Sequence, residues 1–308
     1  MSQSSTPPTA QKKYILAIDS GSTGIRALLF NKQGEIVARS YKTTPMTVPE
    51  EGAVEHDPEM LWQTLLDVVK EVFQSPDYDL AEVASIGITN QRGSFCLVDK
   101  ATGKPLTNFI GWADFRANEV AKRMDHQFNF GALRAVAGIV GNLTGSPMML
   151  TTNMLRMKPV LGVTRLRWLF EQEEVRFHDT VHSGSELYQM CKRDEIHFMT
   201  LDTWFIYKLT GGKQHLTDVT NASGTALYNP FDLVWNKIYF NLFKIPNSPS
   251  MFPKVLDTAG DFGTTDPGVF FGNSIQIGSG VGDHIASLFG HCCFTPGDTK
   301  ISHGSGAF

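Results

Sequence analysis

The sequence predicts an α/β fold with a mixed sheet. Three short strand-like runs stand near the amino end, an amphipathic helix follows them, and the next strand is apolar almost throughout. A strand that is apolar on both faces is typical of a buried, parallel position. This order predicts an antiparallel meander and a crossover helix that leads to a parallel strand in the same sheet.

The meander is predicted from residues 14–18, 26–30 and 36–41, which are short runs rich in apolar residues. The turn at residues 31–34 (NKQG) joins the second run to the third. These runs therefore form the antiparallel part of the predicted sheet.

The crossover helix is predicted to begin at Asp57 and Pro58, which supply an N-cap side chain and a first-turn proline. Apolar residues then recur at helical spacing as far as Phe73. Residues 83–89 (VASIGIT) follow as the buried parallel strand.

The later elements are less regular. They are a hairpin at 95–98 and 106–112, helices at 114–124, 163–173, 202–209 and within 231–243, and a strand at 275–279. Residues 141–158 have no clear period, and we interpret them as an inserted loop anchored by methionines. No repeat or linker interrupts the chain, so we expect one elaborated domain over residues 14–300.

Composition limits the class of partner. The 308 residues carry a formal net charge of -4 and no long run of like charge, which excludes a basic surface for nucleic acid. No segment approaches the roughly 20 apolar residues that span a bilayer. We expect a cytoplasmic protein that binds small molecules, with no nucleic acid partner, no membrane insertion and a disordered leader at residues 1–13.

The cysteines are expected to be buried thiols. Their spacing fits neither a disulfide framework nor a zinc site. They are Cys96, Cys191, Cys292 and Cys293.

Three polar loops stand at the ends of apolar strands. They are DSGST at 19–23, GVGD at 280–283 and SHGSG at 302–306. Their glycines let a backbone approach a ligand closely, and their hydroxyls and acids suit a phosphate or its metal ion. Each loop alone is more often a plain turn, and none matches the Walker pattern.

Together these loops resemble the sugar kinase, heat-shock protein and actin superfamily, and more narrowly the FGGY family of carbohydrate kinases. The matching stretches run in the family's order and include IDSGSTGIRALLF, IGITNQRGSF, GKPLTNFIGWADFRA, HLTDVTNASGTALYNP, GVGDHIASLFGHCCFTPGD and HGSGAF. The resemblance is to the glycerol kinases within this family, and most of all to a divergent animal branch of them.

The resemblance implies a mixed five-stranded sheet with flanking helices, in an actin-like, ribonuclease H-like ATPase domain. This would be the first of two FGGY domains, with residues 301–308 starting the second. It further implies an ATP-dependent transfer of phosphate to a primary hydroxyl of glycerol or a related polyol, with ATP and Mg²⁺ as cofactors. Because the second domain is missing, we expect little ATP turnover from these 308 residues alone; a homo-oligomer is an open expectation.

The nucleotide residues are implied by the same resemblance. Asp19 matches the acid that orients the metal ion, although it could instead cap a turn. The matches around the phosphates are Ser22, Thr23, Gly24 and Arg26 in the first loop and Gly304, Ser305 and Gly306 in the last. Arg26 could alternatively be a solvated strand residue.

Asp283 matches the family's catalytic acid. A carboxylate that accepts the proton of the attacking hydroxyl is the main protein group that phosphoryl transfer requires beside the metal. An acid placed between a strand and a helix could alternatively be an N-cap over Ile285 and Ala286.

The substrate side both matches and departs from the glycerol kinases. Arg92, Trp112, Asp283, His284 and Phe308 are the implied substrate-binding residues. Glycerol kinases have glutamate at Gly93, tyrosine at Val160 and glutamine at His284, and the family signature has lysine at Arg165. Since two hydroxyl partners are lost, a kinase for another sugar such as a ketopentose, or a catalytically weak regulatory member, stays open.

For the remaining polar and aromatic residues we expect structural roles. Trp168 and Trp204 are predicted core aromatics, and Asp202 and Asp218 caps or buried acids. We expect side-chain to backbone bonds to hold the loop near the sugar site, and the residues expected to make them are Thr217, Asp218, Asn221 and Thr225.

Overall fold

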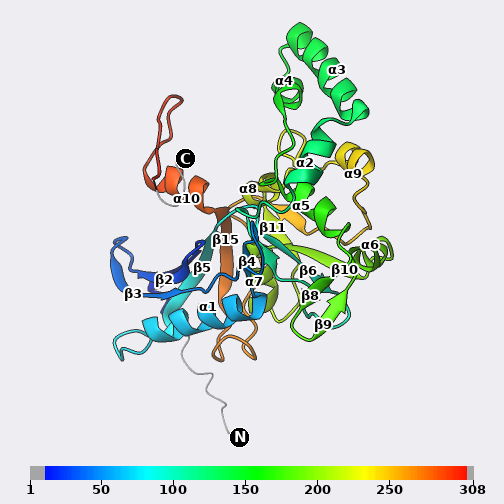
Figure 1. The fold of residues 1–308 in the computed structure, drawn as a ribbon. Coiled ribbons are helices and arrows are strands. Elements are labelled where there is room, and N and C mark those ends of the chain that lie inside the picture. Colours follow the sequence, from blue (N-terminus) through cyan, green and yellow to red (C-terminus); the bar gives the residue numbers. More distant parts are fainter. Residues whose placement is uncertain (1–10, 304–308) are drawn as a thin grey trace, which may run out of the picture.

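A computed structural model describes residues 11–303 as an α/β structure built on a five-stranded sheet (Figure 1). The strand order is β15-β5-β1-β2-β3. These strands are β1 (Tyr14–Ser20), β2 (Gly24–Phe30), β3 (Ile36–Thr43), β5 (Val83–Asn90) and β15 (Gln276–Gly282). β1, β2 and β3 are antiparallel, whereas β15 and β1 run parallel to β5 on either side of it. The predicted mixed sheet is confirmed.

A second sheet continues the structure in the order β10-β6-β7-β4. Its strands are β4 (Glu55–His56), β6 (Phe95–Asp99), β7 (Phe109–Ile110) and β10 (Ile196–Thr200). Two-stranded pairs are formed by β8 (Val175–Phe177) with β9 (Thr180–His182), β11 (Leu216–Asp218) with β14 (Lys254–Leu256), and β12 (Tyr228–Asn229) with β13 (Val234–Trp235).

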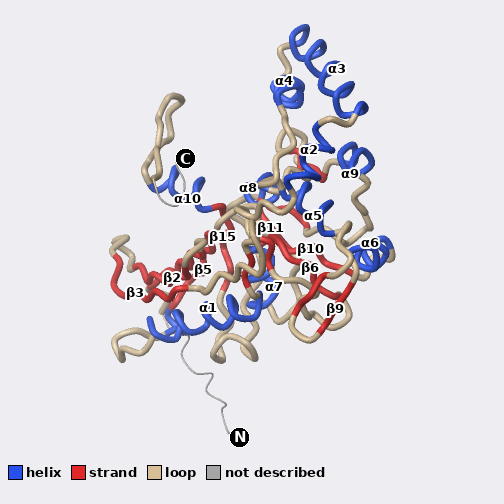
Figure 2. The backbone as a smooth tube through the Cα atoms, viewed as in Figure 1, coloured by secondary structure: helices blue, strands red, loops and turns tan. Residues whose placement is uncertain are grey.

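Helices cover the two sheets and extend beyond them (Figures 1 and 2). They are α1 (Pro58–Val72), the 3-10 helix η1 (Leu80–Glu82), α2 (Asn118–Asp125), α3 (Phe128–Thr144), α4 (Pro147–Met154), α5 (Gly162–Leu169), α6 (Gly184–Lys192), α7 (Leu201–Leu209), α8 (Val219–Gly224), α9 (Lys237–Phe243) and α10 (Asp283–Gly290). No helix within residues 11–303 is long and apolar enough to cross a membrane.

The crossover helix α1 forms as its sequence predicts. The Asp57 carboxylate accepts hydrogen bonds from the amides of Glu59 and Met60, so it caps the first turn. Residues such as Leu65 and Val69 lie on one face and are fully buried against the sheet. α1 therefore joins the meander to the parallel strand β5 and leaves the carboxyl ends of β1 and β5 at one edge.

The core has two parts. One lies around the five-stranded sheet with α1 and α7, and the other surrounds β6 and β10 with α5, α6 and α9. Trp204 is fully buried in the first, as predicted, but Trp168 is only partly buried and lies 4.4 Å from the Arg116 guanidinium.

The prediction of a loop at 141–158 was wrong, because α3 and α4 form a helical hairpin there that projects from the body (Figure 2). Gly145 is left-handed and ends α3, and Ser146 caps α4. Glycines that weaken the helical signal are packing positions here: a Cβ on Gly141 would lie 3.0 Å from Leu150. Close packing between the two helices therefore stabilises this hairpin, although its sequence has no regular spacing of apolar residues.

Two further expectations needed correction. The helix predicted from residue 114 begins at Asn118, because Asp114 is tied into an ionic network before it. Among the cysteines, Cys96 and Cys191 are buried thiols, but Cys292 is exposed and Cys293 partly so.

Candidate active site

The carboxyl ends of three parallel strands bring the candidate acids together. In register, Asp19 of β1 lies beside Thr89 of β5, and Thr89 lies beside Val281 of β15, two residues before Asp283. Since neighbouring strands are about 4.8 Å apart, the two acidic positions lie on the order of 10 Å from each other. Asp19 and Asp283, which we call the strand-end acids, therefore share one edge of the sheet.

Asp19 occupies a position suited to a cation. Burial raises the pKa of its carboxyl, Arg26 at 3.3 Å lowers it, and the charge of Asp283 raises it again. The net upward shift means that the negative charge of Asp19 is under-compensated. A divalent cation would compensate that charge, and Mg²⁺ commonly binds one or two carboxylates with water and phosphate oxygens completing its shell.

The described residues supply only this limited metal site. Within residues 11–303 no group of three or more His, Cys, Asp or Glu side chains is placed to hold a metal ion. Asp19 therefore fits a metal that arrives with a phosphate, and the chain does not build a complete metal cage in this region.

The first polar loop is a tight turn with exposed side chains beside it. Gly21 donates its amide to the carbonyl of Gly24 at 3.0 Å. A Cβ on Gly24 would lie 2.4 Å from the Lys42 carbonyl oxygen, so only glycine fits there. Thr23 and Arg26 are exposed beside it. Both residues are therefore accessible from solvent, and Arg26 pairs there with Asp19.

Ser22 is engaged within the protein. Its hydroxyl donates to Gln91 Oε1 at 2.7 Å and accepts from the Trp112 indole at 3.0 Å. His56 Nε2 contacts the Ser22 carbonyl at 3.2 Å, and burial lowers the pKa of His56. Ser22 therefore links the first loop to Trp112, a connection that the sequence did not indicate.

Asp283 is the first residue of α10, whereas the N-cap position is Gly282, which makes no side-chain cap. The alternative in which Asp283 caps Ile285 and Ala286 is therefore wrong. Its carboxylate, partly exposed, accepts the amide of the next residue at 2.8 Å.

Arg92 lies directly against the end of β15, the strand that precedes Asp283. A Cβ on Gly282 would lie 2.2 Å from Arg92 Cδ, so the arginine stem packs on the glycine backbone. Arg92 Nε is buried and has no hydrogen-bond partner among the described residues. Arg92 therefore holds an unpaired donor beside Gly282, the residue before Asp283.

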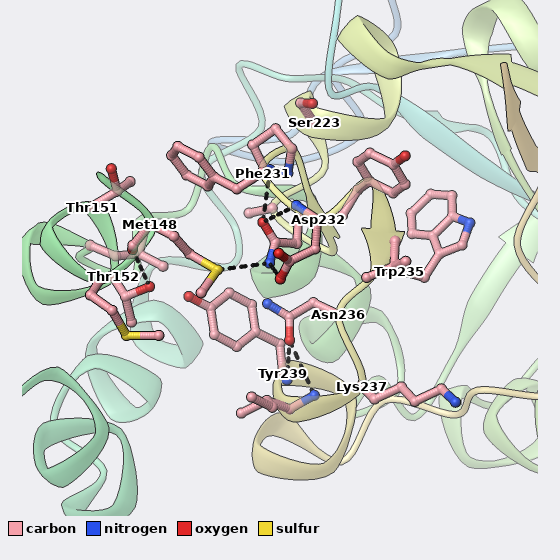
Figure 3. Close-up of a pocket in the computed structure, with 18 of the residues that line it drawn as sticks. Met148, Thr151, Thr152, Ser223, Phe231, Asp232, Trp235, Asn236, Lys237 and Tyr239 are labelled. Atoms are coloured by element: carbon pink, nitrogen blue, oxygen red, sulfur yellow. Dashed lines mark hydrogen bonds between the residues drawn. The ribbon is translucent and has the colours of Figure 1, made fainter. Parts of the chain in front are cut away.

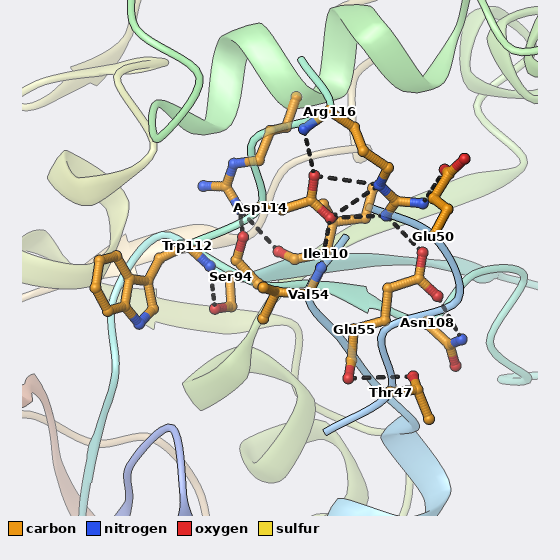
Figure 4. A network of polar contacts seen from close by, with 12 residues as sticks. Thr47, Glu50, Val54, Glu55, Ser94, Asn108, Ile110, Trp112, Asp114 and Arg116 are labelled. Atoms are coloured by element: carbon orange, nitrogen blue, oxygen red, sulfur yellow. Dashed lines mark hydrogen bonds and ion pairs between the residues drawn. The ribbon is translucent and has the colours of Figure 1, made fainter. Parts of the chain in front are cut away.

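Trp112 stands on the same side as Arg92. Its amide donates to Ser94 Oγ at 3.1 Å (Figure 4). Gly93 separates Arg92 from Ser94 and has φ +82°, a left-handed conformation that favours glycine. We call Arg92, Gly93 and Trp112 the Arg92–Trp112 wall.

A buried ionic network supports this wall (Figure 4). Asp114 is fully buried and pairs with Arg116 at 2.7 Å, and Arg116 also pairs with Glu55 at 2.5 Å. Burial alone would lower the pKa of Arg116, but Asp114 and Glu55 raise it above its ordinary value. The motif WADFRA contains both partners, and the two-residue spacing of Asp114 and Arg116 was the available signal.

A second buried network supports the end of β15. Asp218 caps α8 by accepting the amides of Thr220 and Asn221, as predicted. The Thr220 hydroxyl accepts the Gly282 amide at 2.7 Å, and Asn221 exchanges hydrogen bonds with Asn90. The ends of β5 and β15 are thereby joined through α8.

The other predicted loop residues have mixed roles. Thr225 donates to the carbonyl of Ala222, as expected, whereas Thr217 donates to the carboxylate of Asp202. Asp202 is fully buried, as predicted for a structural acid, and burial, then the charge of Asp218, raises its pKa to about 7.

Four predicted site residues lie outside the described residues: Gly304, Ser305, Gly306 and Phe308. His284 follows Asp283 in α10 and is partly buried.

Taken with the contacts above, the structure brings six of the predicted site residues to one region: Asp19, Thr23, Arg26, Arg92, Trp112 and Asp283.

A cavity of about 670 Å³ lies elsewhere, between α4, the segment 228–236 and α9 (Figure 3). Its lining includes Met148, Trp235 and Tyr239 and neither strand-end acid. It is therefore separate from the candidate site.

The comparisons with known proteins agree with this arrangement. The sequence profile for the N-terminal domain of the FGGY family of carbohydrate kinases matches residues 14–290. The chain belongs to the FGGY family of carbohydrate kinases.

Its relatives include glycerol kinases of two branches. Glycerol kinase of Carboxydothermus hydrogenoformans is 36% identical over 297 residues, which cover 96% of this chain and 54% of that protein. Glycerol kinase 5 of Gallus gallus is 32% identical over 295 residues, with 96% and 54% covered. The expected resemblance to glycerol kinases is confirmed, and the chain spans about half the length of these curated relatives.

Solved structures show the same fold. Plasmodium falciparum glycerol kinase with ADP has a TM-score of 0.77 at 24% identity, covering 97% of this chain and 54% of that chain. Xylulose kinase from Rhodospirillum rubrum has a TM-score of 0.74 at 19% identity, with 96% and 54% covered. The actin-like, ribonuclease H-like fold is confirmed.

Proposed function

We propose that this chain forms the first half of an ATP-dependent kinase that phosphorylates a primary hydroxyl of glycerol or a related small polyol. The observation that carries the proposal is the placement of Asp19 and Asp283 at one edge of the sheet, with Arg92 packed on Gly282 beside them. Membership of a family of carbohydrate kinases supports it.

The chain's residues divide the chemistry between them. Thr23 and Arg26 would bind the phosphates of ATP, since both are exposed beside the glycine turn. Asp19 would hold Mg²⁺, which neutralises phosphate charge when it is bound. The predicted last phosphate loop, Gly304–Gly306, would contribute from the region outside the described residues.

Asp283 is the proposed general base. It would accept the proton of the acceptor hydroxyl while that oxygen bonds to the γ-phosphorus, and ADP leaves with the electrons of the broken P–O bond. The partly exposed carboxylate at the start of α10 is accessible for this role. Arg92, Trp112 and His284 would orient the acceptor, together with Phe308.

Another sugar or polyol, such as a ketopentose, is the second candidate acceptor. Gly93 has no side chain and Val160 offers no hydroxyl, so two positions that contact the hydroxyls in glycerol kinases cannot donate or accept through side chains here. These positions leave more room and less polarity, which favours a larger acceptor.

The test is an acceptor screen on a full-length protein, by which we mean this chain together with a second half like that of its relatives. ADP release is measured with glycerol, other polyols, pentuloses and sugar acids, and Asp283→Ala provides the background. Acceptor-dependent ADP well above that background supports the proposal and identifies the acceptor. Release no greater than background with every acceptor would leave a regulatory or binding member of the family as the better description.

A further inference from the structure

Arg165 is a fully buried cation whose hydrogen bonds all go to backbone carbonyls among the described residues. None of its side chain is exposed, and no acid within residues 11–303 forms a salt bridge with it. Burial lowers its pKa to about 10, and the charge of Asp114 raises it in part. The guanidinium therefore remains charged at neutral pH in a position where isolated charges are costly.

Four carbonyl oxygens bind this guanidinium. Nη1 donates to Ile110 at 2.8 Å and Gly111 at 2.6 Å, and Nη2 donates to Gly93 at 2.7 Å and Val160 at 2.9 Å. Nε is buried without a partner among the described residues. The guanidinium therefore makes four charge-assisted bonds from its two terminal nitrogens.

These carbonyls belong to three segments that are far apart in the sequence. Gly93 follows Arg92 after β5, Gly111 precedes Trp112 after β7, and Val160 precedes α5. Two of the three segments carry the Arg92–Trp112 wall. A single side chain therefore joins the segments that carry Arg92, which packs on Gly282, and Trp112, which bonds Ser22.

Where the family signature has lysine, this chain bonds the four carbonyls with an arginine. The planar fork directs two nitrogens at two separate pairs of carbonyls, whereas a lysine has one nitrogen with three donors. A lysine at this position would lose at least one carbonyl, and a carbonyl released in the interior must find another donor or move.

We infer that Arg165 is a positioning residue, which sets the separation of Arg92 and Trp112 and thereby the fit of the phosphoryl acceptor. This inference rests on the proposed function for its kinetic consequence. Its structural part, the position of Trp112, can be measured without any activity.

The first experiment measures Trp112 in Arg165→Lys. The emission of Trp112 is isolated by subtracting the spectrum of the same protein with Trp112→Phe, since four other tryptophans are present. We expect a red shift and greater acrylamide quenching of the Trp112 component, because the indole leaves Ser22. Circular dichroism establishes whether Arg165→Lys is folded. If it is not folded, Arg165→Gln is measured in its place.

The matched control is Arg134→Lys. Arg134 is also a largely buried arginine that bonds a backbone carbonyl and lies over a phenylalanine ring, but on α3. Arg134→Lys is expected to lower the free energy of unfolding and to leave the emission of Trp112 unchanged. A Trp112 component that is unchanged in a folded Arg165 variant would overturn the inference.

The second experiment measures kinetics in the full-length protein. Arg165→Lys is expected to raise the acceptor KM about tenfold, the equivalent of one lost or misplaced hydrogen bond, and to leave the KM for ATP unchanged. A purely structural role would lower the amount of folded enzyme and alter neither KM; that result would contradict the inference. If the wild-type protein phosphorylates no acceptor, the proposed function fails, and the fluorescence experiment still decides the role of Arg165.

Discussion

The strand-end acids and the Arg92–Trp112 wall are positioned in different ways. Asp19 and Asp283 are placed by strand topology, because the parallel strands β1, β5 and β15 end at the same edge. Arg92 and Trp112 are placed by buried side chains, chiefly Arg165 and the Asp114–Arg116 pair.

This difference has a consequence for mutation. Substitutions of the strand-end acids should remove chemistry and leave the fold intact, because these side chains are at least partly exposed. Substitutions behind the wall should alter stability and acceptor binding together, because they act through buried charge.

The largest effect is expected for Asp283→Asn, which removes the proposed base at the strand ends. We expect kcat of the full-length protein to fall about 10²- to 10⁴-fold, the usual contribution of a positioned general base. The acceptor KM and the urea unfolding midpoint should change little, which steady-state kinetics and urea titration will measure. Retention of wild-type kcat would separate Asp283 from the chemistry.

Arg116→Met tests the buried support of the wall. It leaves Asp114 buried without its cationic partner, and removing one member of such a pair costs about 3–5 kcal/mol of unfolding free energy. The matched control Arg193→Met removes an exposed pair with Glu195, for which we expect a much smaller loss because solvent screens the two charges. Equal losses in urea unfolding would contradict a special role for the buried pair.

Asp202→Asn tests whether the buried Asp202 carboxyl makes the stability of the protein depend on pH. Because the pKa of the folded carboxyl is about 7, against an ordinary value of 3.8, the unfolded chain releases this proton first as pH rises. Wild-type stability should therefore fall between about pH 4 and pH 7, on the order of a few kcal/mol, and the variant should lack this component. Unfolding midpoints at pH 5 and pH 8 measure it, and parallel pH profiles of the two proteins would refute it.

Gly282→Ala sharpens the comparison where the two regions meet. The new Cβ would lie 2.2 Å from Arg92 Cδ, so the arginine must move, at a cost of about 1–3 kcal/mol. We expect a raised acceptor KM in the full-length protein. Gly290→Ala is the control, since a Cβ there meets nothing within 4 Å, and an equal change in both variants would be evidence against the contact.

The sequence predicted the strand-end side better than the wall. Alternation, apolar runs and the Asp57 cap are local signals, and they were sufficient for the meander, α1 and β5. The convergence of Asp19 with residues 280–283 follows from parallel strands with a shared edge. The roles of these residues in catalysis stay predictions.

The wall could not be predicted because its contacts join distant segments through backbone atoms. Nothing local to Arg165 indicates that it binds the carbonyls of Gly93 and Gly111. The α3–α4 hairpin was missed for a related reason, since Gly138 and Gly141 serve close packing between helices and dilute the helical pattern.

The central claim is that Asp19 and Asp283 act in one site. Single-turnover formation of the phosphorylated acceptor by full-length wild type, Asp19→Asn, Asp283→Asn and the double variant tests it most directly. The account predicts a large loss in each single variant and a double variant that is little worse than either, since residues of one catalytic unit are not additive. Losses that multiply in the double variant, or wild-type turnover in either single variant, would contradict it.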